Sequence, residues 1–293
     1  MPLKKVYAIV REAGQEWMDD NAMRLSAALA FYTILSIAPL IVVAVAIVGS
    51  ILGQDAASGA LTNQLRSQFG DAGAEVAKTA LVKSSQPDAG LAAALLSSLF
   101  LIFGASSVFS ELQDALNVAC NVKAKPGRSF WNTIRIRLLS FGTVLLIGML
   151  LFASMIATVL LAAFGSTLEG SVPGLATMLN LANVFLGFAL VTILFALLFK
   201  ILPDVRMSWR DVWLGAAASA FLFTAGKYGI GFYLGRAGIA SPFGAAGSLV
   251  VFVVWLYYSY LILFFGVEVA QVTARHNGRT AMPTEHAVAI SAA

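Results

Sequence analysis

Charged residues are scarce in this chain: Asp, Glu, Lys and Arg make up only 12% of its 293 residues. A soluble globular domain carries about 25% charged residues. Hydrophobic residues reach 59%, which is more apolar surface than a soluble core of this length can bury. The composition therefore excludes an ordinary soluble domain and indicates that lipid forms part of the solvent around the protein.

Cysteine and histidine are also rare, and the few present are poorly placed for chemistry. Cys120 is the only cysteine, which excludes an intrachain disulfide. Both histidines, His276 and His286, lie close to the C-terminus, so no histidine metal site can form inside an apolar segment. The sequence also lacks a glycine-rich phosphate loop with its Lys and Ser or Thr. We therefore predict no catalytic residues, no metal and no cofactor, and we do not expect an enzyme.

Long apolar runs are what the chain has in abundance. About 20 mostly apolar residues span the hydrocarbon core of a bilayer as a helix. The segments that reach this length are about 28–52, 90–109, 138–164, 181–202, 212–234 and 247–270. None shows the polar–apolar alternation of barrel strands. We predict an all-α, multi-pass membrane protein with six transmembrane helices in one domain over residues 1–270, followed by a disordered tail at 271–293.

Lysine and arginine are distributed unevenly between the two sides of these spans. The N-terminus, the connections after the second and fourth spans, and the tail together carry 14 of them, whereas the other side carries 4. Cytoplasmic loops of membrane proteins are enriched in Lys and Arg. We therefore predict that both termini are cytoplasmic.

Two further segments are amphipathic. Near the N-terminus, the apolar residues Leu3, Val6, Tyr7, Val10 and Trp17 recur at helical spacing, with Lys4, Lys5 and Arg11 off that face. This pattern predicts a helix lying in the inner headgroup region. Residues 53–89 repeat apolar positions in the same way, which favours short helices on the outer side, with a loosely ordered loop as the alternative.

The first predicted span carries unusual polar residues. Ser26, Thr33 and Ser36 share one helical face, Tyr32 lies beside them, and Pro39 removes a backbone hydrogen bond and should bend the helix. Small hydroxyl residues often let membrane helices pack closely and bond to one another. The alternative is that this face lines a ligand cavity or forms a hinge.

Lys227 lies well inside a predicted span, far from either end. It lies about 22 Å from the cytoplasmic end of that span at 1.5 Å per residue, and no acidic residue is expected at its depth. An ionisable residue within the membrane is a functional candidate. It either extends to the outer headgroups or pairs structurally, or it meets an anionic ligand. The nearby pair Gly231 and Gly235 favours close helix packing or a homodimer.

Charged residues also gather at the predicted inner ends of the spans. The members of this group are Arg24, Glu111, Asp114, Asp204, Arg206, Arg210, Asp211 and Glu268. We predict a charged inner network, either as structural ion pairs that hold the short loops or as a gate for ligand entry.

Several stretches together resemble the YihY/BrkB family of bacterial membrane proteins, whose members are sometimes labelled ribonuclease BN. The stretches are RLSAALAFYTILSIAPL (24–40), VFSELQDALN (108–117), LPDVRMSWRDVWLGA (202–216), GKYGIGFYL (226–234), FGAAGSLVVFVVWLYYS (243–259) and LFFGVEV (263–269). Phe243 departs from the family pattern, which more often has tyrosine. The resemblance implies a six-helix inner-membrane protein, and the family's association with envelope properties implies transport of an amphiphile or lipid.

These observations lead to three functional hypotheses. The first is a transporter of an anionic amphiphile or lipid, in which Lys227, the polar face of the first span and the inner charges line the path. The second is a structural or scaffolding membrane protein without transport activity. The third, an integral-membrane enzyme, needs a cluster of metal ligands or a nucleophile with its base. The partners we expect are membrane lipids and a second copy of the chain, not nucleic acid.

Overall fold

The computed structural model describes four long stretches of the chain and several short pieces. The long stretches are 3–35, 110–125, 175–237 and 246–279, and the short pieces are 55, 58–59, 62–63, 66, 74–75, 78, 108, 282–285 and 287–290. The chain divides into two compact units. The first unit holds Met1–Gln15, Cys120–Thr224 and Phe265–Ala293, and the second holds Glu16–Ala119 and Ala225–Phe264.

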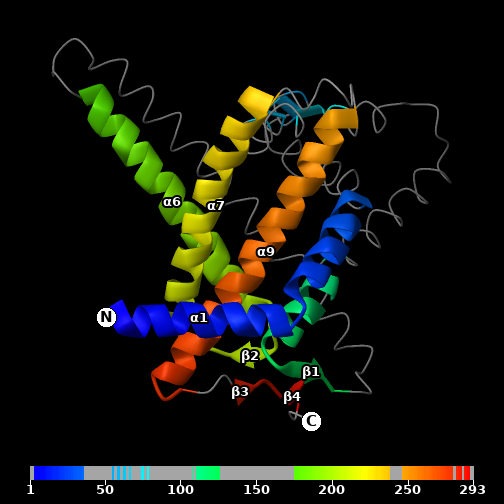
Figure 1. Ribbon diagram of the computed structural model, residues 1–293, viewed down its shortest axis with the longest axis vertical. Coiled ribbons are helices and arrows are strands. Elements are labelled where there is room, and N and C mark those ends of the chain that lie inside the picture. Colours follow the sequence, from blue (N-terminus) through cyan, green and yellow to red (C-terminus); the bar gives the residue numbers. More distant parts are fainter. Residues whose placement is uncertain are drawn as a thin grey trace. The chain divides into compact units, whose positions relative to one another are not determined.

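Most of the described residues are helical (Figure 1). The labelled helices are α1 (Leu3–Asp19), α6 (Leu175–Ile201), α7 (Trp209–Ala237) and α9 (Ala246–His276). A shorter apolar helix covers Ala22–Leu35. The described residues of the outer segment 53–89 are helical as well, which agrees with the expected short helices at those positions.

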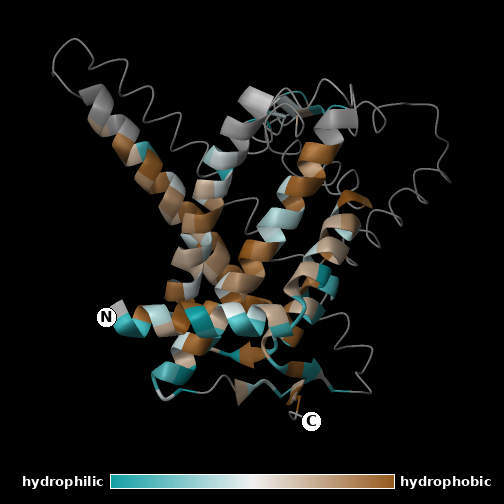
Figure 2. Ribbon diagram, viewed as in Figure 1, coloured by the Kyte–Doolittle hydropathy of each residue, from teal (hydrophilic) through white to brown (hydrophobic). Residues whose placement is uncertain are grey.

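Helices α6, α7 and α9 coincide with the predicted spans 181–202, 212–234 and 247–270. Within the described residues, Leu181–Ile201 and Val250–His276 are long and apolar enough to cross a membrane. Figure 2 shows the hydrophobic colour along most of α6 and α9. Most of the predicted spans at 28–52 and 90–109, and all of that at 138–164, lie outside the described residues. The helical character is therefore confirmed, and the number of spans stays a prediction.

In the first unit, α7 and α9 approach so closely that only glycine fits between them. A Cβ atom on Gly215 would collide with the backbone carbonyl of Gly266 and lie 2.8 Å from Cβ of Ala270. A Cβ atom on Gly266 would collide with Oγ of Ser219 and lie 2.9 Å from the Phe199 ring. Gly215 and Ser219 are four residues apart on α7, as Gly266 and Ala270 are on α9. Two small-xxx-small pairs therefore face each other at this crossing.

Helix α1 packs on the same unit through a narrow buried strip. Ile9 and Ala13 are buried against Val269 and Val272 of α9, with Ala218 of α7 and Phe265 alongside. The large apolar residues Val6, Tyr7 and Val10 are exposed instead. Three residues of the predicted apolar face of α1 are therefore exposed, whereas Trp17 is half-buried and donates to the carbonyl of Leu261 at 3.1 Å.

The C-terminal tail is ordered where it is described, so the prediction of a disordered tail is wrong there. Strand β4 (Ala287–Ala289) pairs antiparallel with β1 (Val122–Ala124), and β3 (Met282–Pro283) pairs antiparallel with β2 (Val205–Arg206). The tail thereby satisfies backbone groups of two connections that would otherwise need water. Strands this short leave no periodic signal in a sequence.

A glycine turn at the end of α9 directs the chain into this pairing. The N–H of Gly278 donates to the carbonyl of Arg275, and the N–H of Arg279 donates to the carbonyl of Ala274, each at 2.9 Å. Gly278 has a φ of 68°, which glycine adopts at little cost. This is the Schellman arrangement that ends helices, and it turns the chain back after His276.

We predict that the α7–α9 crossing tolerates no side chain. Gly215→Ala places a methyl group against backbone, which cannot move aside, and should destabilise the protein by about 1–3 kcal/mol. Gly229→Ala on the same helix is the matched control, because a Cβ there meets nothing within 4 Å, and it should be neutral or slightly stabilising. Thermal unfolding in detergent measures both. Equal melting temperatures for the two variants would contradict the close crossing.

Candidate functional site

Lys227 lies on α7, in the second unit, and is half-buried. Among the described residues it makes no hydrogen bond or ion pair. Its neighbour Gly226 faces the ring of Tyr258 on α9 so closely that a Cβ would collide with it. Gly229 faces open space. Lys227 therefore follows directly on the position where α7 packs against the Tyr258 ring.

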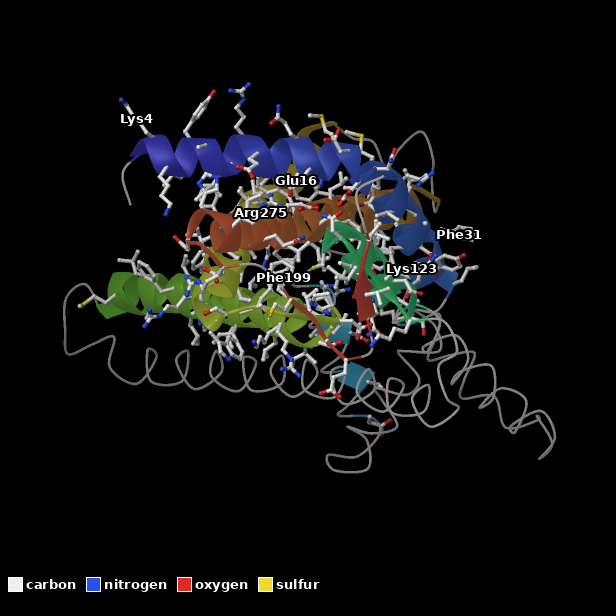
Figure 3. The ribbon with its side chains drawn as sticks, turned by 90° about the horizontal axis from the view of Figure 1, so that it is seen from below. Lys4, Glu16, Phe31, Lys123, Phe199 and Arg275 are labelled. Carbon is white, nitrogen blue, oxygen red and sulfur yellow. The ribbon has the colours of Figure 1, made fainter. Side chains whose placement is uncertain are left out.

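The polar residues in and just before the first predicted span differ in burial: some are buried or bonded to another helix, and one is exposed. Ser26 is fully buried, at 0% exposed. The hydroxyl oxygens of Thr33 and Tyr260 lie 2.6 Å apart and share a hydrogen bond between the Ala22–Leu35 helix and α9. Tyr32 is exposed and packs edge-on against Phe31, which points outward in Figure 3. Ser36 and Pro39 lie outside the described residues. In the second unit, Thr33 therefore contributes a bond between helices, and Tyr32 does not share its environment.

A buried carboxylate anchors the tail in the first unit. Asp211, in the first turn of α7, is 1% exposed. One of its oxygens, Oδ1, accepts from Nη2 of Arg279 at 2.9 Å and from Nδ2 of Asn277 at 3.2 Å. Neither partner belonged to the predicted inner network, because the tail was expected to be disordered. The pairing of Gly278 with a following Arg279 is the signal that could have indicated it.

A second ionic cluster joins α1 to the end of α9. Glu12 lies 3.1 Å from Nη2 of Arg275 and 2.8 Å from Nε2 of His276. The hydrogen bond from His276, with the positive charge of Arg275, holds the pKa of Glu12 below its usual value. Nζ of Lys5 donates to Oδ1 of Asn277 at 2.9 Å. Figure 3 shows Arg275 on α9 beneath α1. Sequence reasoning missed this cluster because Glu12 and His276 are more than 260 residues apart.

The other residues of the predicted inner network are divided between the two units. In the first unit, the carbonyl of Asp204 accepts from the N–H of Thr284 at 2.9 Å, Arg210 is exposed, and Glu268 is buried within α9. Arg206 lies 3.7 Å from Glu285, and both side chains are exposed. The residues in the second unit are Arg24 and Asp114, both exposed, and Glu111, which is half-buried. The single network therefore stays a prediction.

Tryptophan and lysine mark the beginning of α7. Nζ of Lys200 donates to the carbonyl of Met207 and lies 5.8 Å from the centre of the Trp209 ring. The rings of Trp209 and Trp213 are 6.5 Å apart, and both are partly exposed. Aromatic side chains with cations are typical of the membrane–water interface. Within the described stretches, no three His, Cys, Asp or Glu residues gather as metal ligands.

Comparison with known proteins places nearly the whole chain within one family. The family model described as "Virulence factor BrkB" matches residues 13–290. A UPF0761 membrane protein of Ralstonia nicotianae is 28% identical over 272 residues, which cover 91% of this chain and 58% of the relative. UPF0761 membrane proteins of Legionella pneumophila and Stenotrophomonas maltophilia are 24% and 26% identical over 92% and 88% of this chain.

The chain covers 58–63% of the length of the Ralstonia and Legionella relatives. No solved structure matches the chain.

We predict that Arg279 and Arg206, which both contact carboxylates in the first unit, differ sharply in their contribution to stability. Arg279→Gln leaves the buried carboxylate of Asp211 without its cation and should cost about 1–3 kcal/mol. Arg206→Gln is the matched control: its pair is 71% and 83% exposed, so the change should stay within about 0.5 kcal/mol. Chemical or thermal unfolding in detergent compares them. A larger loss for Arg206→Gln would show that the tail is held in another way.

Proposed function

Because this chain belongs to the BrkB family of membrane proteins, we propose that it is a multi-pass protein of the bacterial inner membrane with cytoplasmic termini. The support is the composition of the first unit. Helix α1, strand β1, the β2 connection and the tail carry most of the cations assigned to the cytoplasm, and hydrogen bonds and strand pairing join them. These segments can only meet if they lie on one side of a bilayer.

We propose that the protein moves an anionic amphiphile, of which a phospholipid is the favoured example, between the leaflets. Lys227 is the observation that carries this proposal. It is an ammonium group on an apolar helix, half-buried, and without an acidic partner among the described residues. A cation at membrane depth is costly unless an anion or water accompanies it. A phosphate or carboxylate headgroup would provide that anion.

The surroundings of Lys227 suit a ligand that enters from the side. Tyr228 beside Lys227 is exposed, and its ring offers an amphipathic surface for a lipid. Acyl chains would remain in the bilayer while the headgroup passes along α7, so a large water-filled channel is not needed.

A scaffolding function is the second candidate, and close packing favours it. The Thr33–Tyr260 hydrogen bond and the glycine crossing of α7 and α9 hold helices together within each unit. In that case Lys227 would extend to the headgroups and serve as an anchor. We propose no catalytic activity, because the sequence provides no nucleophile with a base. The partners implied by either function are membrane lipids, with a homodimer as a further proposal, and not nucleic acid.

The transport proposal predicts that Lys227 controls lipid movement. In liposomes that contain the full-length protein and a fluorescent anionic phospholipid, dithionite quenching reports exchange between leaflets. Lys227→Ala should slow exchange at least about tenfold, the value of one charge-assisted contact, and Lys227→Arg should retain most of it. Lys123→Ala, which removes an exposed cation of the first unit, should have no effect.

Two outcomes would contradict the proposal. Wild-type protein that exchanges lipid no faster than empty liposomes, under any gradient, favours the scaffold. Equal exchange of zwitterionic and anionic lipids would show that Lys227 does not select a negative headgroup.

A further inference from the structure

The outward face of α1, formed by Val6, Tyr7 and Val10 with Lys4 and Arg11, is the most unusual surface of the first unit. Tyr7 is 70% exposed, Val10 46% and Val6 42%. Lys4 and Arg11 are exposed too. A helix on the surface of a soluble protein turns its apolar side chains inward, whereas α1 turns them outward and buries only Ile9 and Ala13.

The charged residues of α1 lie on two faces, one that contacts α9 and one that faces outward. Glu12 and Lys5 point to the end of α9, where Arg275, His276 and Asn277 bond to them. On the outward face, neither Lys4 nor Arg11 makes a hydrogen bond or an ion pair within the part of the chain that the structure describes. Figure 3 shows Lys4 directed away from α9. The contacts with α9 therefore fix the rotation of α1 and present two uncompensated cations together with three apolar side chains.

We propose that this outward face binds anionic phospholipids of the leaflet on which α1 lies, with Tyr7, Val6 and Val10 among the acyl chains and Lys4 and Arg11 on the phosphates. The apolar residues and the cations of this face favour opposite surroundings. The apolar residues disfavour water, and the cations disfavour hydrocarbon. A negatively charged headgroup layer satisfies both, because apolar burial and attraction to anionic lipid add together there.

A second copy of the chain fits this face less well. In a symmetric contact the same patch would meet itself, which would set Lys4 and Arg11 against the like charges of the other copy. Like charges facing each other across an interface are costly. The Trp209–Trp213 pair and Lys200 in the same unit are also typical of the headgroup level. The lipid surface is therefore the occupant that the charges favour.

The proposal rests on the membrane placement given above, and it is independent of whether Lys227 carries a ligand. Its test uses the full chain with Cys120→Ser and a fluorescent label at Tyr7→Cys, in nanodiscs of phosphatidylcholine and phosphatidylglycerol. Brominated lipids quench a fluorophore that they contact. Brominated phosphatidylglycerol should quench several times more strongly than brominated phosphatidylcholine at equal bromine content.

Charge variants separate this preference from simple proximity to lipid. Lys4→Gln and Arg11→Gln should each lower the preference for brominated phosphatidylglycerol about fivefold, or abolish it where the preference is smaller than that. This is the effect expected from the attraction of one cation to an anionic leaflet. Lys123→Gln, an equal loss of charge on β1, should leave it unchanged.

Three results would overturn the proposal. Equal quenching by both lipids means that α1 meets the bilayer without selecting its charge. No quenching by either lipid means that α1 does not lie in the membrane, which also contradicts the placement on which the proposal rests. Quenching that follows the protein-to-lipid ratio instead of lipid type means that a second copy covers the face. None of these results depends on lipid exchange, so failure of the transport proposal is recognised separately.

Discussion

The buried carboxylate of Asp211 is the constraint on which the arrangement of the first unit depends. It is 1% exposed, and a negative charge in that position needs a cation and hydrogen bonds. Arg279 supplies the cation, and it and Asn277 both donate to Oδ1; they reach it because the Gly278 turn reverses the chain after α9. Once the chain is reversed, β3 and β4 reach the two connections with which they pair.

The helices also satisfy their polar groups by pairing and pack closely where they cross. Where α7 and α9 cross, close backbone approach replaces side-chain packing, as is common when lipid offers apolar surroundings on every side and hydrophobic burial gains little. The hydroxyl of Thr33 shares a hydrogen bond with the hydroxyl of Tyr260. The carboxylate of Glu12 pairs with the side chains of Arg275 and His276. Several described cations make no hydrogen bond or ion pair among the described residues. Of these, Lys227 lies on an apolar helix, and Lys4 and Arg11 lie beside exposed apolar residues on α1, so these three are suited to meet something else.

Much of the helical layout followed from the sequence, because apolar length is a local property. The runs at 181–202, 212–234 and 247–270 became α6, α7 and α9. Their ends agree within three residues, except that α6 begins six residues earlier, at Leu175, and α9 ends six residues later, at His276. The position of α1 followed from its periodicity. The sequence did not predict three features: the tail strands, the Asp211 pairing and the Glu12 cluster. Each of them joins residues that are far apart in the chain, and no local sequence pattern identifies the partner residue. The sequence singles out Gly231 and Gly235 but not the small residues at the α7–α9 crossing, because a small-xxx-small pair is informative only when the opposing helix is known.

The proposed topology requires α1, β1 and the β2 connection to lie on the cytoplasmic side. Single cysteines at Lys4, Lys123 and Arg206, all exposed, can be introduced into a Cys120→Ser chain and treated with a membrane-impermeant maleimide. The account predicts labelling of all three in inside-out vesicles and of none in intact spheroplasts, with the reverse for a cysteine at Lys78, which is exposed on the opposite predicted side. Labelling of any one of the three from the outside, under conditions in which Lys78→Cys reacts, would contradict the assembly of these segments on one face of the membrane.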